Sequence, residues 1–206
     1  MTRNRQPLPA LPLQSSIPSS QYRLIVTTSQ RCNCERRWEC DECREYWIRR
    51  RQRSNERWLA DAIGSDGETW FGMFTIKTNG DWQAEVNELF SRWSRLGKLR
   101  SQLRYRANQN GLGAIRRGIG VIHLVGSNGH YQPHLHAVLV SDPSLDIRPI
   151  TNAWQSVGGY ADMQSARSLG AVVRYSIAGP LPDAVEDRKE VATLLRGVRI
   201  VRRLGR

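Results

Sequence analysis

The sequence predicts an α+β fold, in which an antiparallel β-sheet carries helices on one face, as in ferredoxin-like or RRM-like domains. Two observations lead to this prediction. Segments of strand and helix character follow residue 66 in the order β-α-β-β-α-β-α, which is typical of such a sheet. All four cysteines lie before that point. We therefore divide the chain into a disordered tail (1–21), a small cysteine- and arginine-rich module (22–66) and a sheet domain (67–206).

The first predicted strand and helix follow Gly67. Residues 70–78 (WFGMFTIKT) are rich in aromatic and β-branched side chains and are followed by Asn79-Gly80, so they predict a strand that ends in a turn. Asp81 can cap the next helix, because apolar residues recur at helical spacing as far as Leu103. Residues 111–118, rich in glycine and arginine, predict a loop.

A hairpin is predicted in the middle of the sheet domain. Residues 120–125 (GVIHLV) and 134–140 (HLHAVLV) have strand character, and Ser127-Asn128-Gly129 between them is a turn sequence. A short helix, a strand and a further helix are then expected over residues 147–157, 158–164 and 166–177. This last helix ends at Gly179-Pro180, and Asp183 predicts the start of a final helix.

Composition narrows the class of protein. The 206 residues include 31 basic and 19 acidic side chains, a net charge of +12, and all but three of the basic residues are arginine. Such an excess is typical of proteins that bind a polyanion, most often nucleic acid, although a GC-rich genome also favours arginine. No stretch reaches the roughly 18 apolar residues of a membrane helix, and no signal peptide is recognisable. We expect a cytoplasmic globular protein with no membrane partner.

The four cysteines predict a structural zinc site. Their spacing is C-x-C-x5-C-x2-C, and four thiolates this close together can complete a tetrahedral zinc site that leaves no open position for catalysis. The alternatives are two disulfides or four unrelated buried thiols, and a reducing compartment disfavours disulfides. The predicted zinc ligands are Cys32, Cys34, Cys40 and Cys43.

Arginines gather in segments that have few acidic residues. Residues 49–53 read RRRQR, and residues 100–117 and 196–206 contain no acidic residue. A run of charge is often only a solvated helix face, but beside a zinc module we interpret it as contact with nucleic-acid phosphates. The arginines assigned to this contact are Arg49, Arg50, Arg51, Arg53, Arg116 and Arg117.

Three of the four histidines predict a divalent metal site. His134 and His136 are two residues apart in a predicted strand, so their side chains point to the same face of the sheet. His123 lies on the preceding strand of the hairpin and can join them as a third ligand, which leaves open positions on the ion. The alternative is that they are hydrogen-bonded core histidines. His130 falls in the turn and is not assigned a role.

Four segments together resemble the HUH endonuclease superfamily, and more narrowly the rolling-circle replication initiators (Rep proteins) of small plasmids and single-stranded DNA phages. Residues 132–140 (QPHLHAVLV) resemble the family's His-hydrophobic-His motif and are the most specific match. Three further segments resemble parts of the family, and with this motif they stand in the family's order along the chain: the cysteine-rich segment 31–58, the strand 71–78 and the segment 158–175. The chain departs from many relatives in having His123 in place of a glutamate and in lacking the lysine that usually follows the tyrosine.

The resemblance implies a metal-dependent, site-specific DNA endonuclease and strand transferase with the HUH nuclease fold. The three histidines would hold Mn²⁺ or Mg²⁺, and Tyr175 would form a 5′-phosphotyrosine and free a 3′-OH, with Arg174 contacting the DNA. Tyr160 is the competing nucleophile. The implied substrate is single-stranded DNA at a replication origin in a bacterial cell, where the enzyme rejoins strands at termination and host replication proteins are further partners.

Two alternatives to the initiator are an HUH-type transposase and a non-catalytic, zinc-containing nucleic-acid-binding protein. The short chain and the lack of a second tyrosine near Tyr175 favour the initiator over the transposase. A non-catalytic sheet protein would bind nucleic acid through exposed aromatic side chains on its strands. Three histidines on adjacent strands would then have no explanation.

Overall fold

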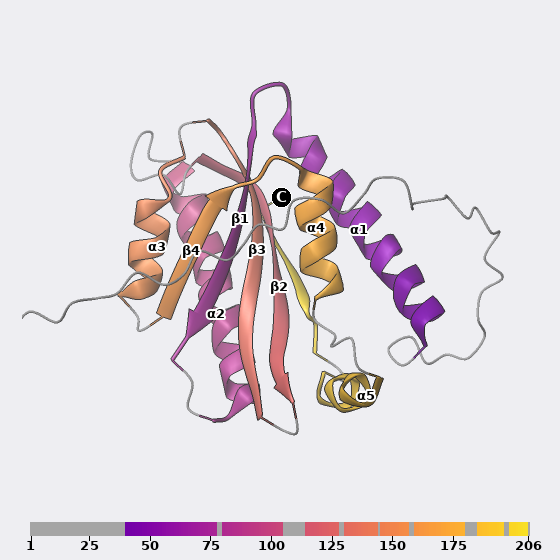
Figure 1. Cartoon of the computed structure of the whole chain (residues 1–206). Helices are drawn as coiled ribbons and strands as arrows, with labels where there is room; N and C mark the ends of the chain where they lie inside the picture. The colour runs from indigo at the N-terminus through magenta and orange to yellow at the C-terminus, as the bar shows by residue number, and fades with distance from the viewer. Residues whose placement is uncertain are drawn as a thin grey trace, which may run out of the picture. The chain divides into compact units, whose positions relative to one another are not determined.

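The structure is a computed structural model, shown in Figure 1, and it describes residues 40–77, 80–104, 114–127, 130–143, 145–156, 159–179, 185–195 and 198–205. The described helices are α1 (Asp41–Ile63), α2 (Trp82–Arg104), α3 (Arg148–Gln155), α4 (Leu169–Ala178) and α5 (Val185–Leu194). The described strands are β1 (Glu68–Ile76), β2 (Ile115–Ser127), β3 (His130–Ser141), β4 (Gly159–Ser165) and β5 (Val201–Leu204). No helix among these residues is both long enough and apolar enough to cross a membrane.

The strands form one antiparallel sheet in the order β4-β1-β3-β2-β5. This confirms the predicted α+β class, the antiparallel sheet and the hairpin of β2 and β3. The prediction of a loop over residues 111–118 is wrong from Ile115 onward, where β2 begins, because pairing with β3 overrides the weak strand propensity of glycine. Strand β5 was not predicted, since four residues are too few to show a period.

Helices cover both faces of the sheet, so the prediction of helices on one face is wrong. Helices α2 and α3 pack on the face that carries Phe74, Leu135 and Leu139, whereas α1 and α4 pack on the face that carries Val121 and Val138. The physical reason lies in β2 and β3, whose side chains are apolar on both faces. A sheet of this kind must be covered on both sides to keep apolar surface from water.

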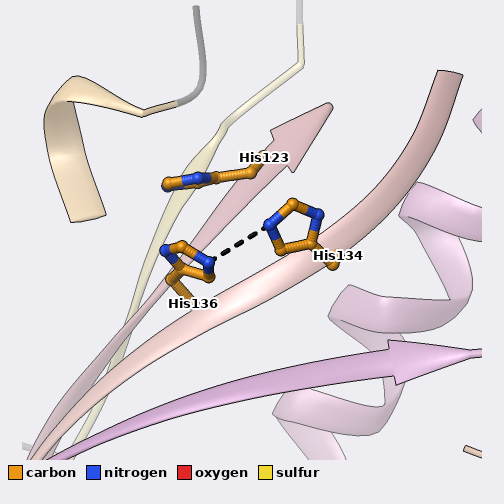
Figure 2. A group of neighbouring side chains, drawn as sticks. All are labelled: His123, His134 and His136. Atoms are coloured by element: carbon orange, nitrogen blue, oxygen red, sulfur yellow. Dashed lines mark hydrogen bonds between the residues drawn. The ribbon is translucent and has the colours of Figure 1, made fainter. Parts of the chain in front are cut away.

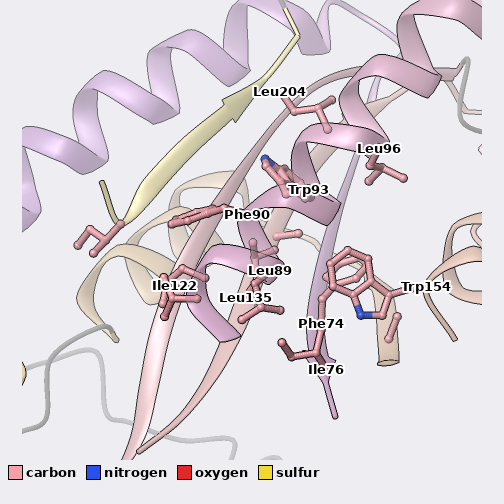
Figure 3. Close-up of a cluster of buried hydrophobic side chains, with 14 of the residues drawn as sticks. Phe74, Ile76, Leu89, Phe90, Trp93, Leu96, Ile122, Leu135, Trp154 and Leu204 are labelled. Atoms are coloured by element: carbon pink, nitrogen blue, oxygen red, sulfur yellow. The ribbon is translucent and has the colours of Figure 1, made fainter. Parts of the chain in front are cut away.

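The larger core lies between α2 and the sheet, and Trp93 is its largest fully buried side chain (Figure 3). Two glycines of β2 make room for this core. A Cβ atom on Gly120 would lie 2.9 Å from Cε2 of Trp93, and one on Gly118 would lie 2.5 Å from Cδ2 of Leu139. Glycine is therefore required at position 120 by the close packing of α2 on β2, and at position 118 by the Leu139 side chain of β3.

Helix α1 belongs to the same fold as the sheet. Its buried residues Ile48 and Leu59 share a cluster with Val173 and Ile177 of α4 and with side chains of β2 and β3. The predicted division between residues 66 and 67 therefore does not separate two hydrophobic cores among the described residues. The predicted tail, residues 1–21, and the first part of the cysteine-rich module lie outside the described residues.

Candidate metal centre

The hairpin of β2 and β3 brings three histidine side chains together (Figure 2). His123 is directly opposite His134 in the antiparallel register, and His136 lies two residues further along β3 on the same face. Nε2 of His134 and Nε2 of His136 are 3.1 Å apart, and one ring nitrogen from each of the three histidines lies within 4.8 Å of the others. The predicted clustering of these three histidines is confirmed, and the cluster could hold a metal ion.

Burial keeps the three imidazoles neutral. It lowers the pKa of His123 to about 2, with the neighbouring His136 adding to the shift, and it lowers the pKa of His136 to about 4, with His134 adding to it. Burial also lowers the pKa of His134. Neutral imidazoles have a lone pair to offer a cation, and the buried Nδ1 of His136 has no hydrogen-bond partner among the residues that the structure describes.

The donor set fits a divalent transition metal, for which imidazole is a suitable ligand. The cluster consists of three uncharged nitrogens and, among the described residues, includes no carboxylate. Such a set leaves the charge of a divalent cation uncompensated by the protein. An anionic ligand, such as a phosphate, would therefore be attracted to the open positions of the ion.

The end of α4 is in contact with His123. Nε2 of His123 donates a hydrogen bond to the main-chain carbonyl of Ser176, with a distance of 2.6 Å. In a helix that carbonyl would accept from the N–H four residues later, but residue 180 is a proline and has no N–H. The carbonyl is therefore free to accept from the imidazole. A Cβ atom on Gly179 would lie 2.1 Å from Cε1 of His123, so only glycine lets the ring approach this closely.

Tyr175 lies beside the histidine cluster. Its ring is nearly parallel to that of His136, with the two ring centroids 5.4 Å apart, and 60% of the residue is exposed. Phe71 of β1 makes edge-to-face contacts with both rings, at 5.2 Å from His136 and 5.7 Å from Tyr175. The structure thus places an accessible phenol next to the candidate metal ligands.

Tyr160 lies further from the cluster. It is an exposed residue of β4 on the same sheet face as the histidines, because its neighbours Ala161 and Met163 point into the opposite core. In the sheet, β1 lies between β4 and β3, and Tyr160 pairs with Thr75. Two strand spacings, about 10 Å, therefore separate its backbone from β3.

Arg116, which was predicted to contact phosphates, is hydrogen-bonded within the fold. Its guanidinium donates hydrogen bonds to the carboxylates of Asp142 and Asp66 and to the main-chain carbonyls of Ala62 and Ile63. These bonds tie the end of α1 and the turn after it to the sheet. We therefore remove Arg116 from the residues assigned to phosphate contact.

The other predicted arginines lie on or near α1. Arg49 and Arg174 both form ion pairs with Glu45, with nitrogen–oxygen distances of 2.8 and 3.1 Å. The pair of Arg174 and Glu45 joins α4 to α1. Burial raises the pKa of Glu45, but hydrogen bonds from these two arginines bring it below its usual range. The remaining α1 arginines in the prediction are exposed: Arg50, Arg51 and Arg53. Arg117 donates to the main-chain carbonyl of Trp58.

Two of the four predicted zinc ligands lie within the described residues. Cys40 precedes α1 and Cys43 lies in its first turn, and both are partly buried. Cys32 and Cys34 lie outside the described residues.

The residues that surround the histidines were not predicted from the sequence. Phe71 is predicted there only as part of a strand, and Gly179 and Pro180 only as the end of a helix. The sequence does contain a signal for Ser176: the residue four positions later is Pro180, which has no N–H to donate to the Ser176 carbonyl within a helix. In comparisons with known proteins, no family model, no curated protein and no solved structure matches this chain.

Proposed function

We propose that this protein is a metal-dependent, site-specific DNA endonuclease and strand transferase that initiates rolling-circle replication. The observation that carries the proposal is the position of Tyr175, an exposed phenol stacked on His136 at the edge of a three-histidine cluster. A nucleophile and a set of neutral metal ligands at one place are the parts that phosphodiester transesterification needs.

In the proposed reaction the phenolic oxygen of Tyr175 attacks the scissile phosphorus of a single DNA strand. A bond forms between the phenolic oxygen and phosphorus, which stays on the 5′ oxygen of the downstream fragment; the bond from phosphorus to the 3′ oxygen of the upstream fragment breaks, and that oxygen takes up a proton and leaves as a 3′-OH. One phosphoester bond replaces another, so the step is reversible and the same site can rejoin strands. The phenol gives up its proton to solvent or to a base.

The residues of the site have separate roles in this reaction. His123, His134 and His136 would hold a divalent cation, Mn²⁺ in preference to Mg²⁺ because the ligands are imidazoles, and the ion would supply charge stabilisation at the phosphate oxygens. Phe71 packs against Tyr175 and His136 and limits how their rings move relative to each other. Arg174 shares Glu45 with Arg49, so this group of three side chains carries one net positive charge next to the nucleophile. A structural zinc on Cys32, Cys34, Cys40 and Cys43 is part of the proposal.

A covalent adduct tests the proposal. Because the origin sequence is not known, the substrate is a randomised single-stranded DNA pool, incubated with the protein and Mn²⁺. A 3′-end label should move to a protein-linked band on a denaturing gel, and the released 5′ fragments should be extendable by a polymerase from their 3′-OH. Tyr175→Phe should abolish both signals.

Tyr160→Phe is the matched control, because it removes the same hydroxyl from an exposed tyrosine of the same sheet face. An adduct that survives Tyr175→Phe and disappears in Tyr160→Phe would show that the nucleophile is wrong. Strong DNA binding without any adduct would favour the non-catalytic alternative. The cover of α1 and α4 over the histidine face argues against that alternative, since it leaves less open sheet for bases to stack on.

A further inference from the structure

A second group of residues combines positive charge with an aromatic ring, on the side of α1 that faces β5. The guanidinium carbons of Arg117 and Arg203 lie 5.1 and 4.8 Å from the centroid of the Trp58 ring. Arg117 belongs to β2 and Arg203 to β5, so residues from three elements meet at this indole. A cation at this distance from an aromatic face is attracted by the ring's electron density.

A buried amide orients Arg203. Nε of Arg203 donates a hydrogen bond to Oδ1 of Asn55, a residue that is only 3% exposed. Nη2 of Arg203 donates to the main-chain carbonyl and to the hydroxyl of Ser54. Nδ2 of Asn55 in turn donates to the main-chain carbonyl of Arg51. The guanidinium is therefore fixed by neutral acceptors, which leave its charge uncompensated.

Like charges are crowded around this guanidinium. Burial lowers the pKa of Arg203, and the nearby Arg199, Arg51 and Arg117 lower it further. Among the described residues no ion pair joins Arg51, Arg199 or Arg203 to a carboxylate, and the carboxylate of Asp61 lies 3.9 Å from Arg117 and is largely exposed. Crowded cations destabilise the folded chain, and a bound anion would reduce that repulsion.

We propose that Arg51, Arg117, Arg199 and Arg203 form a phosphate-binding surface for a single nucleic-acid strand. Several guanidinium groups held apart on different elements suit a chain of phosphates better than one small anion. The rings that could stack on bases are limited here, since Trp58 is already in contact with two arginines. The surface therefore binds the backbone of the strand and does not select its sequence.

The surface lies near the histidine cluster on the same face of the sheet. Arg203 pairs with Ile119 of β2, and Ile119 is four residues before His123 on that strand. Four residues of strand span about 13 Å. Helices α1 and α4 cover the sheet between the two places, so a strand that reaches both must pass over these helices. The assignment of the bound strand as the substrate rests on the proposed function, whereas phosphate binding itself does not.

The test measures binding without metal and without cleavage. Fluorescence anisotropy of a labelled single-stranded oligonucleotide is recorded over a series of NaCl concentrations with the full chain and EDTA. Removal of one phosphate-binding charge lowers the salt slope for a single strand by about 0.7, which corresponds to about fourfold in affinity at 0.15 M salt. Arg199→Gln with Arg203→Gln should therefore lower the slope by about 1.4 and the affinity by about 15-fold.

Three controls keep the test decisive. Arg148→Gln removes an exposed arginine of α3 that is paired with Asp146, and it should leave binding unchanged. Arg203→Lys keeps the charge and should keep the salt slope. Arg199→Gln alone, at an exposed site, reports on the surface if the Arg203 variant fails to fold.

Unchanged affinity and salt slope in folded Arg199→Gln and double variants would overturn the proposal, and so would an equal loss in Arg148→Gln. The result is independent of the proposed enzymatic function. If the wild-type protein forms no covalent adduct but the arginine variants lose DNA affinity, the surface stands and the nuclease does not. If all variants form adducts at saturating DNA and bind DNA with unchanged affinity, the nuclease stands and the phosphate-binding surface does not.

Discussion

Replacing Gly179 by alanine tests whether the end of α4 is fixed to the candidate metal ligand. The backbone at Gly179 has φ −74°, a conformation open to every residue, so alanine there costs nothing in backbone strain. Any effect of Gly179→Ala must come from the added methyl group. That group would lie 2.1 Å from Cε1 and 2.6 Å from Nδ1 of His123.

The size of the effect follows from what can move. An ordinary contact of 3.4 Å requires a displacement of about 1.3 Å, the difference between 3.4 and 2.1 Å. The His123 ring is held by the Ser176 carbonyl and lies 3.8 Å, centroid to centroid, from the His136 ring. Overpacking of this kind costs about 1–3 kcal/mol. The Tm should fall by about 2–4 °C for each kcal/mol in a chain of this size.

Metal affinity should fall together with stability, because the displaced ring is one of three candidate ligands. A loss of about 1.4 kcal/mol corresponds to tenfold in the dissociation constant, so Mn²⁺ should bind about tenfold or more weakly to Gly179→Ala. Thermal unfolding measures the first effect, and electron paramagnetic resonance of free Mn²⁺ measures the second.

Gly97→Ala in α2 is the control, because the nearest atoms to its new methyl group would be 3.6 Å away. In a helix this change should be neutral or should stabilise the protein by up to about 1 kcal/mol. If Gly179→Ala unfolds at the wild-type temperature and binds Mn²⁺ with wild-type affinity, the close approach of α4 to His123 does not exist in solution.

Three further outcomes are expected. In metal-free protein the pKa of His136 is about 4 and that of His123 about 2, so the unfolded chain binds protons before the folded chain does as the pH falls below about 6.5. The free energy of unfolding, measured by urea titration, should therefore be lower at pH 5 than at pH 7. A free energy that does not change with pH would contradict the burial of these rings. Arg116→Ala should lower the Tm in thermal unfolding, because it removes the hydrogen bonds that join the end of α1 to Asp142, and it should leave the salt slope of DNA binding unchanged. Elemental analysis should find one zinc per chain, absent from Cys40→Ser and Cys43→Ser but retained in His134→Ala; zinc retained in both cysteine variants would exclude this site.

The candidate metal site was predictable because it depends on two local rules. Side chains two apart in a strand share a face, which joins His134 to His136, and a short turn places His123 on the neighbouring strand. Neither rule needs knowledge of distant contacts. The position of α4 over the histidines could not be derived this way, since contact between Tyr175 and His136 depends on how a helix packs on the sheet.

The error about the sheet faces has a readable cause. The segment from Ile119 to Ile122 and the segment from Leu135 to Val140 are almost continuously apolar, which indicates strands buried on both faces. Helix α1 was assigned to the cysteine module because its sequence is dominated by charge. Two of its apolar residues, Ile48 and Leu59, are nevertheless buried, so a narrow apolar stripe is enough to place it on the sheet.

Arg116 and Arg117 show why net charge is a poor measure of a nucleic-acid surface. They are adjacent in sequence at the irregularity where β2 begins, and a charge count treats them alike. Arg116 is surrounded by two carboxylates and two main-chain carbonyls, so its charge is compensated inside the fold. Arg117 lies over Trp58 beside other cations, and the carboxylate of Asp61, 3.9 Å away, is largely exposed. Whether an arginine is surrounded by carboxylates of the fold or by other cations depends on tertiary contacts that the sequence does not display.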